Sequence, residues 1–105
     1  MRKEDKGPKV RITDQFHDKK AMVYDLKCDA IRISISIAGS DEVAWEAEGV
    51  AKLVPSPPVA RGVGASRGEA LRLLTEAWSS KGEAAGFPAL DWEAIRQALA
   101  TVRAI

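Results

Sequence analysis

The clearest pattern along the chain is an alternation of four isoleucines with polar residues over positions 31–37. A period of two places all four isoleucines on one face of a β-strand, and their β-branched side chains favour the pleated backbone. A longer alternation over positions 43–53 predicts a second strand, bent at Gly49. Shorter alternations over positions 9–16 and 21–28 predict two more strands.

Residues 20–28 are the ambiguous part of this pattern. Every second residue from Met22 to Cys28 is apolar, as in a strand with one buried face. The positions of Ala21, Met22 and Leu26 are also compatible with one face of a helix. We expect a strand here and keep a helix as the alternative.

The register of the sheet follows from the requirement that Ile35 and Trp45 face the same core. Residue numbers that pair between these two strands must then sum to an even number, so the connecting loop should have three or five residues. A two-residue turn at Asp29-Ala30 would join the predicted strands 21–28 and 31–37 with their apolar faces on the same side, although aspartate and alanine make a poor turn. We therefore expect Trp45 to be buried beneath the helices predicted for the second half of the chain.

The second half of the chain predicts two helices. They follow a segment rich in proline and glycine, residues 55–65, which we interpret as a loop. Ser66 and Glu69 have the spacing of a capping box, and apolar residues repeat at helical spacing from there to Trp78. Asp91 is placed to cap the second helix. The predicted buried stripe of that helix consists of Ile95, Ala98, Leu99 and Val102.

The predicted fold is therefore α+β: an antiparallel four-stranded β-meander followed by two α-helices packed on one face (ββββαα). Residues 1–8 are polar and end in Gly-Pro, which predicts a disordered lead-in, and residues 9–105 are predicted to form a single domain. The sequence has no apolar run of about 18 residues, so no membrane contact is expected. An apolar segment typical of a secretory signal is absent as well, and we expect a cytoplasmic protein.

The composition offers little catalytic chemistry. The chain has one histidine and one cysteine, His17 and Cys28, and the predicted meander places them at opposite ends of a strand. Such a pair is too far apart for nucleophilic catalysis, and a lone cysteine excludes an internal disulfide. Glu46 and Glu48 share the outer face of a predicted strand, where a solvated acidic edge is the simpler interpretation. We expect no enzyme activity, no cofactor and no metal site.

One segment could contact an anion. Gly62 and Gly64 lead into a helix N-terminus, whose free amides and dipole attract negative charge, and basic residues flank them. The candidate contact residues are Arg61, Gly62, Gly64, Ser66 and Arg67. The simpler alternative is a flexible entry to a well-capped helix.

The stretch Gly62–Ala70 resembles the entry to the last helix of double-stranded-RNA-binding domains, which combine a glycine-rich loop, a serine and several lysines at this point. In this chain only Arg67 keeps a basic residue, and Glu69 adds negative charge. The segment Ser66–Leu71 is also similar to HicB-type antitoxins, in which a strand, a Pro/Gly loop and a Thr-x-x-Glu-Ala-Leu helix start follow one another. Both resemblances imply an antiparallel sheet followed by a helix.

These observations favour a small non-enzymatic regulatory or protein-interaction module. The predicted interaction surface consists of Phe87, Trp92 and Ile105, apolar residues near the C-terminal end, and the expected partner is another protein or a second copy of the chain. The alternative is a nucleic-acid-binding domain that contacts phosphate through Arg61, Arg67 and the basic N-terminal residues. It ranks second because 16 basic and 15 acidic residues give a net charge of only +1. The N-terminal basic residues are Arg2, Lys3, Lys6, Lys9 and Arg11.

Overall fold

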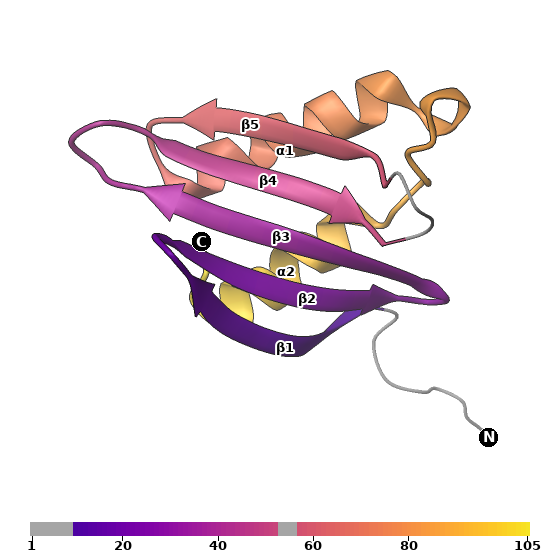
Figure 1. The fold of residues 1–105 in the computed structure, drawn as a ribbon, viewed down its shortest axis with the longest axis horizontal. Coiled ribbons are helices and arrows are strands. Elements are labelled where there is room, and N and C mark those ends of the chain that lie inside the picture. Colours follow the sequence, from indigo (N-terminus) through magenta and orange to yellow (C-terminus); the bar gives the residue numbers. More distant parts are fainter. Residues whose placement is uncertain (1–9, 53–56) are drawn as a thin grey trace.

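Five antiparallel strands form one sheet in which every strand pairs with its neighbour in the sequence (Figure 1). The protein is described by a computed structural model for residues 10–52 and 57–105. Short connections return each strand beside the previous one, so the chain forms a meander. The strands are β1 (Val10–Asp18), β2 (Ala21–Cys28), β3 (Ile31–Gly39), β4 (Trp45–Ala51) and β5 (Val59–Gly64).

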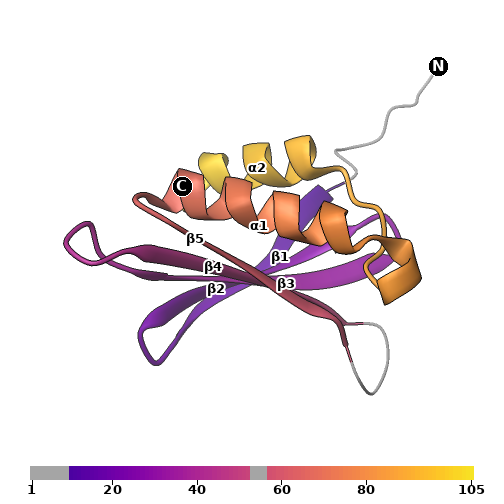
Figure 2. The same cartoon turned by 90° about the horizontal axis from the view of Figure 1, so that it is seen from above.

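Two helices follow the sheet, and both pack on the same face of it (Figure 2). The first, α1 (Arg67–Lys81), lies over β5 and β4, and the second, α2 (Trp92–Thr101), packs against β1. A short 3₁₀ helix, η1 (Glu83–Ala85), lies between them. The described chain is therefore a two-layer α+β domain with its apolar core between the layers.

The structure confirms the predicted α+β meander followed by two helices on one face, but the predicted number of four strands is wrong. The segment predicted as a loop over 55–65 contains the fifth strand, β5. Pro58 does not prevent pairing, because it precedes the first residue of β5 and its carbonyl oxygen still accepts the backbone N–H of Ala51 at 3.3 Å. The predicted lead-in over residues 1–8 lies outside the described residues.

The predicted register between β3 and β4 is confirmed. Gly39 pairs with Trp45 and Ile37 pairs with Ala47, so the paired residue numbers sum to an even number. The loop between them, residues 40–44, accordingly has five residues. This parity keeps the isoleucines of β3 and the alanines of β4 on the helix-covered face.

Residues 21–28 form strand β2, and the alternative of a helix is wrong. Cys28 pairs with Ile31 across a two-residue turn at Asp29-Ala30, as the matching of faces predicts. Asp29 adopts a φ of 56°, in the left-handed region that glycine, asparagine or aspartate enters most easily. A polar residue that tolerates positive φ thus compensates for weak turn chemistry at this position.

Buried apolar side chains fill the space between the helices and the sheet. Trp78 of α1 is only 2% exposed, and its Nε1 donates to the carbonyl oxygen of Pro88 at 2.8 Å. Its ring meets Phe87 and Trp92 edge to face, with centroid distances of 4.9 and 5.6 Å. The other largest fully buried side chains are Leu26, Ile33, Ile35, Leu71, Leu74, Ile95 and Leu99.

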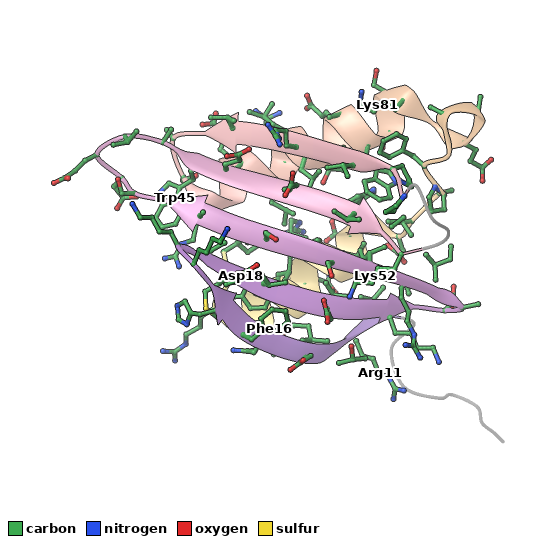
Figure 3. The ribbon with its side chains drawn as sticks, viewed as in Figure 1. Arg11, Phe16, Asp18, Trp45, Lys52 and Lys81 are labelled. Carbon is green, nitrogen blue, oxygen red and sulfur yellow. The ribbon has the colours of Figure 1, made fainter. Side chains whose placement is uncertain are left out.

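Trp45 faces this core, as its register predicts, but the expectation that it is buried is wrong. It is the first residue of β4 and lies at the end of the sheet, where its side chain is half-buried. The start of α1 reaches it there: the guanidinium carbon of Arg67 lies 5.0 Å from the centroid of its ring. Figure 3 shows Trp45 at the opposite end of the sheet from Arg11 and Lys52.

Candidate functional site

The two glycines predicted to line an anion-binding loop belong to strand β5. Gly62 pairs with Ala47 and Gly64 pairs with Trp45, so both glycines are part of the β4–β5 ladder. Both lie under α1, where the absence of a side chain lets helix and strand approach closely. Interpreting this segment as a flexible glycine loop is therefore wrong, and its glycines serve packing.

The entry to α1 is occupied by the protein's own carboxylate. The hydroxyl of Ser66 accepts the N–H of Glu69 at 3.1 Å, which completes one half of the predicted capping box. The carboxylate of Glu69 accepts the N–H of Ala65 at 2.7 Å, one residue earlier than the N-cap amide of the standard motif. A negative charge already lies at this helix N-terminus, which disfavours a second anion there.

Arg61 and Arg67 lie on different faces of the sheet. Arg61 extends from β5 on the side away from α1, and its guanidinium contacts Glu46 and Glu48, both at 3.1 Å. The hydrogen bond with Glu48, together with the charge of Glu46, raises the pKa of Arg61. Arg67 lies on the helix side, over Trp45. The structure does not bring the two arginines together, and anion contact at this helix entry stays a prediction.

The three apolar residues predicted to form an interaction surface are turned mainly inward. Phe87 is 5% exposed and contacts Trp78, while Trp92 and Ile105 are half-buried and pack against the core. The Nε1 atom of Trp92 is buried and has no hydrogen-bond partner among the described residues. An interaction role for these three residues stays a prediction, and most of their apolar area is used inside the domain.

Cys28 is a buried thiol at the end of β2, and His17 lies in the exposed part of β1. Burial raises the pKa of the Cys28 thiol to about 11, helped by the negative charges of Asp29 and Asp91. In residues 10–52 and 57–105, no three histidine, cysteine, aspartate or glutamate side chains gather as a metal site would need. Within the same ranges, every helix is too short or too polar to cross a membrane.

A row of four basic residues crosses the sheet on the face away from the helices. Arg11 pairs with Lys27, and Lys27 pairs with Arg32. Lys52 continues the row, since its N–H donates to the carbonyl oxygen of Arg32 at 2.8 Å. Its Nζ lies 3.3 Å from Asp25. The row is visible only once the pairing is known, because its members come from three different strands and from the residue that follows β4.

The two edges of the sheet differ in character. The β1 edge contains a bulge between Ile12 and Asp14 and is mostly polar and charged beyond it. The β5 edge is short, contains no bulge in its pairing with β4, and exposes Val59 and Val63 by 44% and 54%. Bulges and charges protect an edge strand from pairing, and β5 has little of either.

The antiparallel sheet followed by a helix agrees with what both local sequence resemblances imply about fold. Comparisons of the chain with protein-family models, with curated proteins and with solved structures find no match.

Proposed function

We propose that the chain is a small non-enzymatic protein-interaction module in which the β5 edge pairs with the β5 edge of a second copy. The observation that carries the proposal is the difference between the two edges of the sheet. One edge has a bulge and several charged residues, which oppose strand addition, and the other has two exposed valines, no bulge in its pairing with β4 and one charged residue, Arg61. A cytoplasmic location stays a prediction alongside it.

The hydrogen-bonding groups of β5 alternate between its two sides. Pro58 faces β4, because its carbonyl oxygen accepts the N–H of Ala51. In an antiparallel ladder the residues that bond to a given neighbour alternate, so the backbone groups of Val59, Arg61 and Val63 face away from β4. These three residues offer a partner strand a regular set of donors and acceptors.

A second copy of β5 is a suitable partner strand for reasons of symmetry and charge. Two identical antiparallel strands are related by a two-fold axis, and an axis at Arg61 sets Val59 of each strand opposite Val63 of the other. The two exposed valines then cover each other. The two Arg61 side chains approach across the axis, and each one is already compensated by Glu46 and Glu48 of its own chain. The pairing therefore buries apolar area without leaving an uncompensated charge.

The test is sedimentation velocity over a wide range of protein concentrations with Val63→Pro and Val63→Thr. Proline removes the N–H that faces the partner and keeps every hydrogen bond to β4, so it should abolish dimerisation. Threonine keeps the N–H and the β-branched shape and should dimerise. The free energy of unfolding of the proline variant should change by less than about 1 kcal/mol. A wild-type chain that stays monomeric throughout, or equal loss of dimer in both variants, would contradict the proposal.

A second candidate function, nucleic-acid binding, is favoured by the row of basic residues on the bare face. Like charges on directly paired residues destabilise a sheet, so the pairs Arg11–Lys27 and Lys27–Arg32 carry a cost that the fold does not require. Phosphate groups laid along the row would offset it. The acidic residues Glu46 and Glu48 at the other end of the face would restrict a polyanion to this row.

Electrophoretic mobility of labelled duplex and single-stranded DNA at several salt concentrations tests this alternative. Replacing Arg32 with glutamine should lower the salt dependence of binding by about one unit of slope, as expected for one lost phosphate contact. The matched control is Arg96→Gln on α2, which belongs to the other layer of the domain. An unchanged slope in Arg32→Gln, or the same change in both variants, would exclude the row as the binding surface.

A further inference from the structure

A hollow of about 210 Å³ opens on the helix side of the sheet at the end where Trp45 lies. Six parts of the chain meet around it: the β1–β2 turn, strand β2, the end of β3, the start of β4, the start of α1 and the C-terminal segment at Ala104. Its chemistry comes from Lys20, Met22, Tyr24 and Arg67, with Trp45 as one wall. The row of basic residues lies at the other end of the sheet, so the two features are separate.

Tyr24 is a buried residue whose hydroxyl has no hydrogen-bond partner among the described residues. The residue is only 5% exposed and lines the hollow. Within the described residues its hydroxyl makes no hydrogen bond, and the one fully buried side-chain atom without a partner is Nε1 of Trp92. The Tyr24 hydroxyl is therefore not fully enclosed by protein atoms, and the hollow that Tyr24 lines is the space into which it opens. A buried phenol usually has a hydrogen-bond partner, so this one is available to a ligand.

Two cations flank the hollow. In the part of the chain that the structure describes, the ion pairs include neither Lys20 nor Arg67. The Arg67 guanidinium instead lies over the face of Trp45, which holds it beside the opening. With no ion pair to another described residue, both side chains can form charge-assisted hydrogen bonds with an anion.

The aromatic wall is fixed in place before any ligand arrives. Nε1 of Trp45 donates to Asp41 Oδ1 at 2.7 Å, which orients the indole from the loop that precedes β4. Met22 adds a flexible sulfur-containing side chain that adapts to an aromatic ring. The site thus combines a preorganised apolar surface with two cations and one free hydroxyl.

We propose that this hollow binds an aromatic ring that carries a carboxylate. An apolar cavity of about 150 Å³ is known to hold benzene, so the hollow has room for one six-membered ring and its acid group. The ring packs on Trp45 and Met22, and the carboxylate contacts Arg67 and Lys20. The Tyr24 hydroxyl donates to the same carboxylate or to a substituent of the ring. The ligand is either a free single-ring acid or the C-terminal aromatic residue of a peptide.

Nuclear magnetic resonance titration of the full chain tests the site with two probes. Benzoate represents the free acid and N-acetyl-phenylalanine represents a peptide end, and the indole N–H signal of Trp45 is the readout. At least one probe should shift this signal saturably, with a dissociation constant of about 0.1–1 mM, a reasonable affinity for so small a ligand. The tighter probe identifies the source of the ligand. Benzamide, which lacks the charge, should bind at least about tenfold more weakly than benzoate.

Variants then assign the contacts. Arg67→Gln should weaken the better probe about tenfold and Arg67→Lys should restore part of the affinity, because a charge-assisted bond is lost and regained. Tyr24→Phe should weaken it about fivefold, as expected for one neutral hydrogen bond, without loss of folding, because its hydroxyl has no partner among the described residues. The matched control is Arg72→Gln, on the same helix and outside the hollow.

Three results would overturn the proposal: no saturable shift of the Trp45 signal with either probe, equal affinity for benzoate and benzamide, or equal weakening by Arg67→Gln and Arg72→Gln. Should Arg67→Gln prove unable to fold, Tyr24→Phe carries the decision, and unchanged affinity in that variant contradicts the assignment of the hydroxyl. None of these measurements depends on dimerisation through β5, because Val63 does not line the hollow.

Discussion

Gly62 of β5 lies so close to α1 that a Cβ atom placed on it would be 2.2 Å from the backbone nitrogen of Leu74. The same atom would lie 2.5 Å from the carbonyl oxygen of Ala70. Both contacts are with helix backbone, which cannot move aside as a flexible side chain can. The separation of the two layers over β5 is therefore set by a glycine, and the position excludes every other residue.

Gly62→Ala should accordingly destabilise the protein by at least about 3 kcal/mol, at or above the usual upper end for overpacking, because the clash is with backbone. Gly68 provides the matched control, since a Cβ there would meet nothing within 4 Å. It lies in the first turn of α1, where alanine is the better helix former, so Gly68→Ala should stabilise the protein by about 0.5 kcal/mol. Urea unfolding of both variants measures the two effects, and a neutral Gly62→Ala would show that β5 and α1 are farther apart.

The same glycine explains why the fifth strand could not be predicted. The alternation of large apolar and polar residues that identifies β3 is absent from β5, where the inward positions are Ala60, Gly62 and Gly64. Small inward residues are what a strand needs when a helix lies directly on it, but they look like a loop in a search for hydrophobic periodicity. The signal that could have found the strand is the opposite alternation, with exposed Val59, Arg61 and Val63.

The register between β3 and β4 was predictable because it depends only on whether the connecting loop has an odd or an even number of residues. The Ile35 and Trp45 faces had to match, and a loop of odd length was the only consequence needed. The hollow beside Trp45 was not predictable, because it depends on where α1 begins relative to β4. Arg67 reaches Trp45 only after β5 has brought the chain back beside β4, and β5 was missing from the prediction.

Trp78 and Trp45 should differ clearly in their contributions to stability. Trp78→Ala removes a side chain that is 2% exposed, its contacts with Phe87 and Trp92, and a hydrogen bond to Pro88. It should cost about 3–5 kcal/mol. Trp45→Ala removes a half-buried ring at the end of the core and should cost about 1–2 kcal/mol, since less area is buried and less of a cavity remains. Equal losses in denaturant unfolding would contradict the burial of these two residues.

The capping interactions of α1 form a unit that a double-mutant cycle can resolve. Ser66→Ala removes the acceptor for the N–H of Glu69 and should cost about 0.5–2 kcal/mol. Glu69→Ala removes the acceptor for Ala65 and should cost less, because this bond is exposed to solvent. The double variant should lose less than the sum of the two, since both bonds restrain the same short segment, residues 65–69. Glu69→Gln keeps an acceptor oxygen and serves as the control, and fully additive losses would mean that the two bonds form independently.

Cys28 gives a prediction about pH. Burial and the nearby charges of Asp29 and Asp91 raise the pKa of the thiol from about 9 to about 11 in the folded state. The folded state therefore keeps a proton that the unfolded state loses between these two values, so the thiol's stabilising contribution is full below about pH 9 and decreases as pH rises toward 11. The decrease can reach at most about 1.4 kcal/mol per pH unit for one group.

The free energy of unfolding of the wild type and of Cys28→Ala should accordingly converge between pH 9 and about pH 11. Lysine and tyrosine titrations contribute alike to both proteins and cancel in the comparison. A native thiol that reacts with a disulfide reagent at pH 8 as fast as the urea-unfolded chain, or a difference between the two proteins that stays constant with pH, would show that Cys28 is exposed rather than enclosed at the end of β2.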